Sequence, residues 1–109
     1  MGSYKETESD IKHCIICICG ESGSGKTYLA NKLKDSHTIV LDGDAVRKYI
    51  NYDLTYTDED RYKNNLIISN IAELLYYQGH YIIISTVRAD IAYDILKRKG
   101  VECKLIKLC

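Results

Sequence analysis

The feature that most constrains this chain is a glycine-rich loop between an apolar run and a helical pattern. Residues 20–27 match the pattern G-x-x-x-x-G-K-[ST] at every fixed position. An apolar run of strand character, residues 13–19, precedes the loop, and residues 28–34 carry apolar side chains at helical spacing. This order is typical of a phosphate-binding loop (P-loop), in which backbone N–H groups and the N-terminus of a helix bind phosphate oxygens.

The residue types in the loop predict a role for each position. We expect Lys26 to reach the β- and γ-phosphates of ATP and the Thr27 hydroxyl to ligate Mg²⁺. The other predicted nucleotide contacts are Gly20, Ser22, Gly23, Ser24 and Gly25. A glycine-rich turn that binds nothing is the alternative, and the strand before the loop and the helix after it argue against that alternative.

The rest of the chain alternates between strand and helix patterns. Further strands are predicted at residues 38–41, 80–85 and 101–108, and further helices at residues 45–50, 58–77 and 90–99. Continuous apolar runs such as residues 82–84 fit a parallel sheet that is covered on both faces. The order therefore predicts an α/β fold, a doubly wound parallel sheet of about four strands with the architecture of P-loop NTPases and kinases.

The long helix at residues 58–77 has the clearest boundary signals. Thr57 is the predicted N-cap, because acidic residues crowd the turn that follows it. Gly79 is expected to end this helix, and Gly100 the last one. The predicted core face of the long helix consists of Ile67, Ile71, Leu74 and Leu75.

Length and charge bound the class of protein. A chain of 109 residues predicts one domain, here a polar segment at residues 1–12 followed by a P-loop kinase domain at residues 13–109. Because 15 basic and 15 acidic side chains cancel, we expect no general nucleic-acid or membrane surface. The polar, acidic start and the lack of a long apolar run predict a cytoplasmic protein without a signal peptide or transmembrane helix.

Three of the five cysteines form a C-x-x-C-x-C pattern that looks like a metal or redox motif. Cys14, Cys17 and Cys19 lie in the first predicted strand, along which side chains alternate between the two faces. Cys14 and Cys17 are therefore expected on opposite faces, where they cannot bind one zinc ion. The odd cysteine count argues against a disulfide framework. We interpret these thiols as small buried apolar groups.

A second group of candidate site residues follows the second predicted strand. Asp42 and Asp44 are expected at the carboxyl end of that strand, where doubly wound sheets bind ligands. Two carboxylates there suit a metal contact and a base for an acceptor hydroxyl, although a surface turn with an aspartate N-cap explains them equally well. Arg47 and Arg61 suit bidentate phosphate or sulfate recognition, although solvated charge on a helix surface is the commoner origin of such residues.

Taken together, the motifs resemble those of the adenylylsulfate kinase family. Residues 41–47, L-D-G-D-A-V-R, are similar to its L-D-G-D-N-x-R motif, and residues 54–64, L-T-Y-T-D-E-D-R-Y-K-N, to its L-G-F-S-x-E-D-R-x-x-N motif. With the P-loop, the resemblance covers roughly residues 14–105. The family phosphorylates the 3′-hydroxyl of adenosine 5′-phosphosulfate with Mg-ATP. The resemblance thus implies an ATP- and Mg²⁺-dependent kinase of sulfate activation and assimilation, with a small nucleotide-like anion as acceptor.

The resemblance also implies roles for individual residues. Asp44 would act as the base or orienter for the acceptor hydroxyl, and Asp42 would support Mg²⁺ through water. Tyr56 stands where the family has a phenylalanine that stacks on the adenine of the acceptor, and Ser85 falls where the family has a serine beside the acceptor pocket. The phosphosulfate and ribose of the acceptor would be held by Arg47, Arg61 and Asn64.

The chain departs from the family pattern in three places. Ala45 replaces the asparagine of the second motif, and the segment Val87-Arg88-Ala89 has no proline where the family has Ile-Ser-Pro-Tyr-Arg. The family also continues into a lid with an Asp-Pro-Lys-Gly-Leu-Tyr motif, whereas this chain stops at Cys109. We therefore expect the C-terminal lid region to be missing, with Arg88 as a candidate to replace a lid cation.

Several readings stay open at this stage. The chain is a fragment, a minimal variant, or a protein whose site is completed by a homodimer or a second subunit. The altered segment at residues 87–89 allows another nucleotide-linked or small anionic hydroxyl acceptor, for example a cytidine diphosphoramidate. An ATP-binding module without turnover is the remaining alternative.

Overall fold

The computed structural model describes residues 14–108; the predicted polar segment 1–12, His13 and Cys109 lie outside the described residues. The elements follow one another as β1 (Ile15–Cys19), α2 (Lys26–Leu33), β2 (Thr38–Asp42), α3 (Gly43–Tyr49), α4 (Asp58–Tyr76), β3 (Tyr81–Thr86), α5 (Ala89–Arg98) and β4 (Cys103–Lys107). The predicted alternation of strands and helices is confirmed. α3 begins two residues earlier than predicted, directly after β2.

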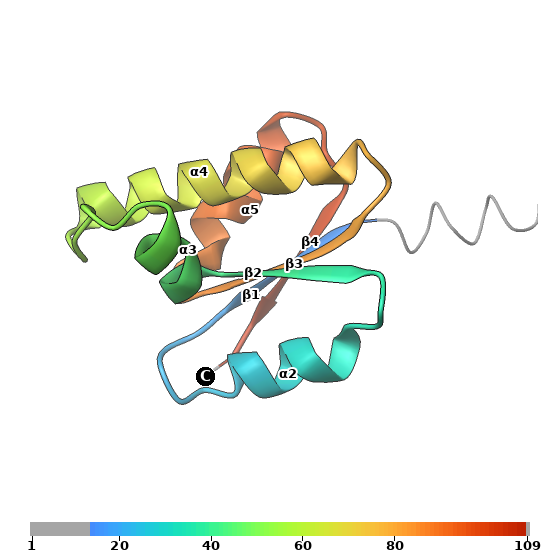
Figure 1. The fold of residues 1–109 in the computed structure, drawn as a ribbon, viewed down its shortest axis with the longest axis horizontal. Coiled ribbons are helices and arrows are strands. Elements are labelled where there is room, and N and C mark those ends of the chain that lie inside the picture. Colours follow the sequence, from blue (N-terminus) through green and yellow to red (C-terminus); the bar gives the residue numbers. More distant parts are fainter. Residues whose placement is uncertain (1–13, 109) are drawn as a thin grey trace, which may run out of the picture.

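The four strands form one parallel sheet in the order β2-β3-β1-β4. Ile83 of β3 lies opposite both Ile16 of β1 and Val40 of β2, so β3 is an inner strand. α2 lies on one side of the sheet, and α4 and α5 lie on the other (Figure 1). This arrangement confirms the predicted α/β doubly wound fold. The connections leave β1 and β3 in opposite directions, and doubly wound sheets bind ligands at such a switch point.

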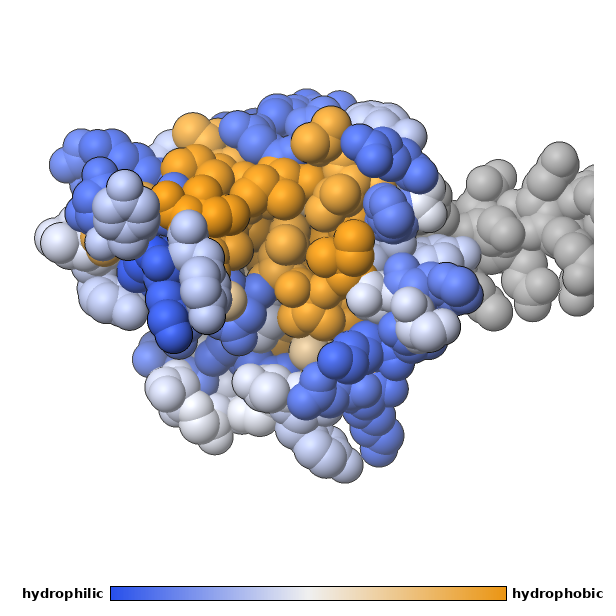
Figure 2. Space-filling view, in the orientation of Figure 1, coloured by the Kyte–Doolittle hydropathy of each residue, from blue (hydrophilic) through white to orange (hydrophobic). Residues whose placement is uncertain are grey.

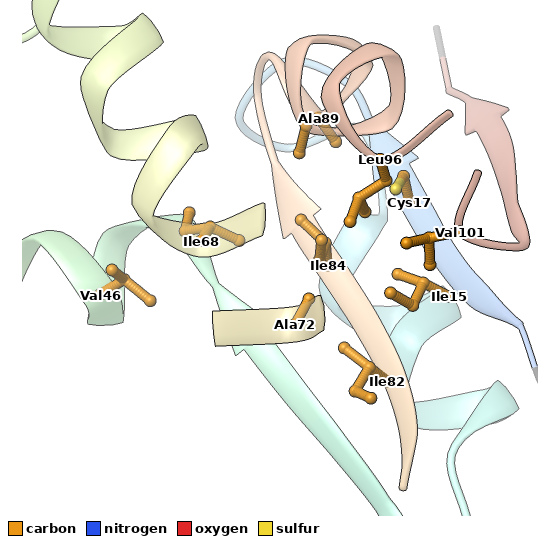
Figure 3. Packing of buried hydrophobic residues seen from close by; sticks show 11 residues of the cluster. Ile15, Cys17, Val46, Ile68, Ala72, Ile82, Ile84, Ala89, Leu96 and Val101 are labelled. Atoms are coloured by element: carbon orange, nitrogen blue, oxygen red, sulfur yellow. The ribbon is translucent and has the colours of Figure 1, made fainter. Parts of the chain in front are cut away.

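The core consists of two clusters, one on each face of the sheet. The larger cluster joins β1 and β3 to the helices of one face and is drawn in Figure 3; its fully buried members include Ile15, Cys17, Ile68, Ile82, Ile84 and Leu96. The smaller cluster lies under α2 and joins Ile18, Ala30 and Ile83. Ile15 and Cys17 thus face one side while Ile18 faces the other, as the predicted alternation along the first strand requires.

The thiol of Cys17 is fully buried in the larger cluster. Burial raises the pKa of this thiol far above its ordinary value, because the thiolate would lose its hydration. Cys17 therefore acts as a small apolar side chain in the core. Among residues 14–108, no three histidine, cysteine, aspartate or glutamate side chains lie where they could hold one metal ion.

The long helix α4 packs on the sheet with a face that differs from the predicted one. Leu75 does pack at the edge of the larger cluster, but Ile67 and Ile71 are only half-buried and Leu74 is 61% exposed. The buried residues of α4 are Asn64, Asn65, Ile68, Ser69 and Ala72. The prediction of the core face was therefore wrong in most of its positions.

Local hydrogen bonds explain why polar side chains of α4 can point inward. The Asn65 Nδ2 donates to the Arg61 carbonyl at 2.9 Å, and the Ser69 Oγ donates to the Leu66 carbonyl at 2.7 Å. A buried polar group is tolerated when it is hydrogen-bonded, and these bonds come from the preceding turn of the same helix. The inward polar residues at 64 and 65 lie in the half of α4 that is nearer to its N-terminus.

The predicted start of α4 and the predicted glycine stops after α4 and α5 agree with the structure. Thr57 caps α4, with its Oγ1 accepting from the Asp60 N–H at 3.2 Å. Gly79 and Gly100 follow α4 and α5 with φ angles of 92° and 79°, a region that other residues rarely adopt. None of the described helices is long and apolar enough to cross a membrane.

β2 forms one edge of the sheet, and each of its five residues is half-buried. In the space-filling view, apolar residues gather over the middle of the surface turned to the viewer, between α4 and α2 (Figure 2). The functional candidates lie elsewhere, at the carboxyl ends of the strands.

Candidate active site

A hollow of about 630 Å³ lies at the carboxyl ends of β1, β2 and β3. Four segments line it: the P-loop, the junction of β2 and α3, the start of α4 and the loop between β3 and α5. Its lining residues are Glu21, Ser22, Gly23, Gly25, Lys26, Thr27, Tyr28, Asp42, Asp44, Arg47, Tyr56, Arg61, Asn65, Ser85, Thr86, Val87 and Arg88. The structure therefore brings together candidates that are as far apart in the sequence as Ser22 and Arg88.

The P-loop has the backbone that its glycines predict. Gly23 and Gly25 have φ angles of 86° and 98°, and open space surrounds the position of a β-carbon at each. α2 starts directly after Gly25, and no side chain in the described part of the chain caps its first N–H groups. An uncapped helix N-terminus of this kind attracts an anion.

Lys26 folds back onto its own loop. Its Nζ donates to the carbonyls of Gly20 at 2.6 Å and Glu21 at 3.0 Å. These bonds hold a positive charge beside the uncapped start of α2. Gly20, at the other end of the loop, is buried and allows close packing, since a β-carbon there would lie 2.5 Å from the Ser24 Oγ.

Asp42 and Asp44 both line the hollow, but they have different local contacts. The Oδ1 of Asp42 accepts from the N–H groups of Asp44 at 2.8 Å and Ala45 at 3.2 Å, so Asp42 is the N-cap of α3. The alternative explanation of an aspartate N-cap is therefore correct for Asp42. The two capping hydrogen bonds orient its carboxylate at the end of β2. The Asp44 side chain is 85% exposed and lies 3.8 Å from an Nη of Arg47, a loose ion pair.

Arg47, Tyr56 and Arg61 form a cationic-aromatic group on the wall of the hollow. The guanidinium carbon of Arg47 lies 4.1 Å from the centre of the Tyr56 ring, and that of Arg61 lies 5.9 Å from it. Arg47 is buried, whereas Tyr56 is 60% exposed. This group places two positive charges around one aromatic face, a combination that suits an anion attached to a planar base.

Asn64 lies behind the wall of the hollow and does not line it. Its Oδ1 accepts from the Asn51 Nδ2 at 2.9 Å, and its Nδ2 lies 3.5 Å from the Gly43 carbonyl. Asn64 therefore ties α4 to the loop that carries the two aspartates. The next residue, Asn65, does line the hollow. Sequence reasoning missed Asn65, because only the packed orientation of α4 distinguishes the two neighbouring amides.

The loop between β3 and α5 is held by an ion pair. Arg88 donates from Nε and Nη2 to the two carboxylate oxygens of Asp90, each at 2.9 Å. The Arg88 hydrogen bond holds the pKa of Asp90 below its usual range. The Cys19 Sγ also donates to the Val87 carbonyl at 3.1 Å, which connects this loop to the end of β1. Arg88 is thus already paired, although it lines the hollow.

Four further residues line the hollow beside the predicted site residues. Glu21 lies within the P-loop and Tyr28 directly follows it, and Thr86 and Val87 follow Ser85 at the end of β3. Ser85 itself is buried and lines the hollow. The contributions of Thr86 and Val87 follow from the sheet order, which places the end of β3 between the ends of β1 and β2.

A parallel α/β sheet with a P-loop between β1 and the following helix defines a nucleotide-binding domain of the P-loop NTPase fold. Comparison with known proteins then specifies the family. Residues 12–103 match the family model described as adenylylsulphate kinase. The chain belongs to the adenylylsulphate kinase family.

The names of individual relatives agree with this family assignment. The chain is 38% identical to the adenylyl-sulfate kinase of Paraburkholderia xenovorans over 88 residues, covering 75% of this chain and 49% of the relative. It is 40% identical to the probable adenylyl-sulfate kinase of Bacillus subtilis, covering 72% and 45%. The Mycobacterium tuberculosis APS kinase CysC, solved in complex with AMPPNP and APS, has a TM-score of 0.74 and 28% identity, covering 86% of this chain and 61% of that chain.

The chain spans about half the length of these stand-alone curated relatives. It also matches a bifunctional enzyme NodQ of Rhizobium meliloti, at 37% identity over 79 residues, of which it covers only 12%. In that relative, the matching segment is a small part of a much longer protein.

Proposed function

We propose that this chain carries the nucleotide- and acceptor-binding core of an ATP-dependent adenylylsulfate kinase. The reaction is transfer of the γ-phosphate of ATP to the 3′-hydroxyl of adenosine 5′-phosphosulfate. The observation that carries the proposal is that the P-loop, Asp44 and the Arg47–Tyr56–Arg61 group line one hollow. A phosphate-binding loop alone suits ATP, whereas a cationic-aromatic wall in the same hollow suits a second, anionic ligand with a planar ring.

On the ATP side, the loop N–H groups, the serines at 22 and 24 and Lys26 would bind the phosphates. Lys26 would exchange its bonds to the Gly20 and Glu21 carbonyls for phosphate oxygens, which are stronger acceptors because they are charged. The Ser24 Oγ is buried without a partner in the described residues, which fits a group awaiting a ligand oxygen.

The residues present also fit a magnesium ion. The Thr27 hydroxyl and the Asp42 carboxylate both line the hollow, and both are the hard oxygen donors that Mg²⁺ takes, directly or through water. Because Oδ1 of Asp42 caps α3, the metal contact falls to its Oδ2. When bound, Mg²⁺ would neutralise charge on the transferring phosphates.

On the acceptor side, Tyr56 would stack on the adenine, and Arg47 and Arg61 would pair with the phosphosulfate. Asp44, whose side chain is 85% exposed in the hollow, would orient the 3′-hydroxyl and accept its proton. The 3′-oxygen then forms a bond to the γ-phosphorus as the bond to the β-phosphate oxygen breaks, and ADP leaves. Asn64 would act through the position of α4 and the aspartate loop, with direct ribose contact as the role that the resemblance implies.

Three further assignments belong to the same proposal. The acceptor is a small nucleotide-like anion rather than a nucleic acid or a membrane, in keeping with a formal net charge of zero. A homodimer or a second subunit would complete the site over the open side of the hollow. The protein would work in the cytoplasm.

An assay of ADP release with Mg-ATP, with and without adenosine 5′-phosphosulfate, tests the proposal. ADP release that depends on the acceptor supports it and shows that this chain suffices for turnover. ATP binding without acceptor binding or acceptor-dependent release contradicts it and favours a binding module. The same assay should include other anionic hydroxyl acceptors, for example a cytidine diphosphoramidate. The reason is that Val87 and Arg88, which belong to the segment that departs from the family pattern, line the hollow.

A further inference from the structure

The described residues contain three buried side-chain polar atoms that lack a hydrogen-bond partner. They are the Oγ of Ser24, the Nε of Arg47 and the Oδ1 of Asn65. Such atoms are uncommon in folded proteins, because each gives up its hydration without a replacement. Arg47 and Asn65 line the hollow, and Ser24 belongs to the P-loop beside it. Two of the three atoms therefore belong to residues that line one hollow, where a bound ligand would provide the missing partner.

Asn65 is the member of this set to which no role follows from the motifs. It is 2% exposed and lies on the buried face of α4. Its Nδ2 donates to the Arg61 carbonyl at 2.9 Å. The reverse orientation of the amide would place two oxygens against each other, so this bond determines which atom is left over. The left-over atom is the carbonyl oxygen Oδ1, which can only accept.

The neighbouring amide provides an internal contrast. Asn64 is equally buried, but both ends of its amide have partners, Asn51 and the Gly43 carbonyl, and it does not line the hollow. Asn65 lines the hollow and keeps one end unpaired. An amide whose only task was to hold α4 in place would need no unpaired acceptor.

The surroundings of Asn65 specify the chemistry of the group it can bind. The two cations on this wall, Arg47 and Arg61, are hydrogen-bond donors without acceptor capacity. An anion would satisfy the arginines and would be repelled by a carbonyl oxygen. The unpartnered Oδ1 of Asn65 therefore suits an O–H or N–H group on the same ligand that the arginines bind.

Resting on the proposed function, we propose that Asn65 determines specificity for the acceptor nucleotide. Its Oδ1 accepts a hydrogen bond from an O–H or N–H of that nucleotide, either a ribose hydroxyl or the exocyclic amine of the base. A site built to accept such a bond discriminates strongly against analogues that lack the donor, because the buried oxygen is then left unpaired.

The test is calorimetric binding of adenosine 5′-phosphosulfate and, separately, of Mg-ATP to the protein and to N65L. We expect the affinity for adenosine 5′-phosphosulfate to fall about tenfold or more and the affinity for Mg-ATP to stay within about twofold. The control is N70L, because Asn70 is an exposed residue of the same helix that does not line the hollow. Its side chain accepts a hydrogen bond from the Lys99 ammonium. N70L should leave both affinities unchanged.

The thermal midpoint of the unliganded protein separates specificity from a structural role. N65L removes the unpaired acceptor, which should raise the midpoint, and also the bond from Nδ2 to the Arg61 carbonyl, which should lower it, so the midpoint of N65L should stay close to that of the parent protein. A structural role predicts a lower midpoint with equal losses for both ligands. If N65L does not fold, N65A provides the same comparison with a smaller side chain.

Three analogues identify the donor. The 2′-deoxy and 3′-deoxy forms of adenosine 5′-phosphosulfate each lack one ribose hydroxyl, and inosine 5′-phosphosulfate lacks the exocyclic amine. The analogue that lacks the donor should bind the parent protein and N65L equally. An unchanged affinity of N65L for adenosine 5′-phosphosulfate, with the parent protein binding it, would overturn the role of Asn65 and leave the proposed function standing. Failure of the parent protein to bind adenosine 5′-phosphosulfate at all would overturn both.

Discussion

Gly43 packs against Thr86 so closely that a β-carbon on Gly43 would lie 2.6 Å from the β-carbon of Thr86. Gly43 lies between the two aspartates of the hollow, and Thr86 ends β3. Only a residue without a side chain allows the backbone of this loop to approach the end of β3. The close approach places Asp42 and Asp44 beside the P-loop, which explains why a glycine separates them.

Replacement of Gly43 tests this packing. G43A should push the aspartate loop away from β3 and lower the free energy of unfolding by about 1–3 kcal/mol, as overpacking of a close contact does. It should also weaken acceptor-dependent turnover, because Asp44 moves with the loop. Urea denaturation and ADP release measure the two effects. Unchanged stability and turnover would show that the loop has room to move.

Lys26 should be required for ATP binding but not for folding. K26A removes a charge-assisted contact to phosphate, so we expect ATP affinity to fall about tenfold or more. The bonds that Lys26 makes in the structure are to loop carbonyls near the surface, and their loss should leave the thermal midpoint nearly unchanged. Calorimetric titration with Mg-ATP measures the affinity, with K32A, on an exposed position of the same helix, as the control. Equal affinities of K26A and the parent protein would contradict the assignment of the P-loop.

Asp44 should be needed for transfer and not for ATP binding. D44N keeps the shape of the side chain and removes its basicity, so we expect turnover to fall about 10²- to 10⁴-fold. Because the side chain is 85% exposed, folding should be unaffected. Single-turnover ADP release and Mg-ATP titration measure the two properties. D53N, in the exposed part of the loop before α4, is the matched control, and equal turnover of D44N and D53N would exclude Asp44 as the base.

The pair of Arg88 and Asp90 should stabilise the protein in a pH-dependent way. The pKa of Asp90 is held below its usual range, so the unfolded chain binds the proton more readily than the folded one. The stabilisation is therefore complete above the unfolded pKa of about 4 and is lost as the pH falls through the lower folded pKa.

D90N should be less stable than the parent protein by about 1 kcal/mol near neutral pH, and the difference should shrink below about pH 4. Urea denaturation at about pH 7 and about pH 3 measures both values. D94N, an exposed aspartate on the same helix, should show no such pH-dependent difference. A difference for D90N that does not change with pH would mean that the carboxylate charge plays no part.

Much of the fold was predictable because its signals are local. The P-loop pattern, the apolar runs at 15–18 and 82–84 and the glycines after the helices each act over a few residues. The periodicity of α4 was misleading for the same reason. Ile67, Ile71 and Leu74 have helical spacing, but Asn65 and Ser69 are the buried residues, because carbonyls of the preceding turn accept hydrogen bonds from the Asn65 Nδ2 and the Ser69 Oγ.

The candidate site was also predictable only in its local features. By itself, the sequence determined the phosphate-binding loop, the order of the strands and helices and the identity of the residues near each strand end, since hydrogen bonding and backbone preference within short segments decide these. Only the tertiary structure decided that Asn65 rather than Asn64 lines the hollow, that Arg47 is buried against Tyr56, and that Gly43 lies against Thr86. Those contacts join segments far apart in the chain, and the packing of the helices on the sheet sets them.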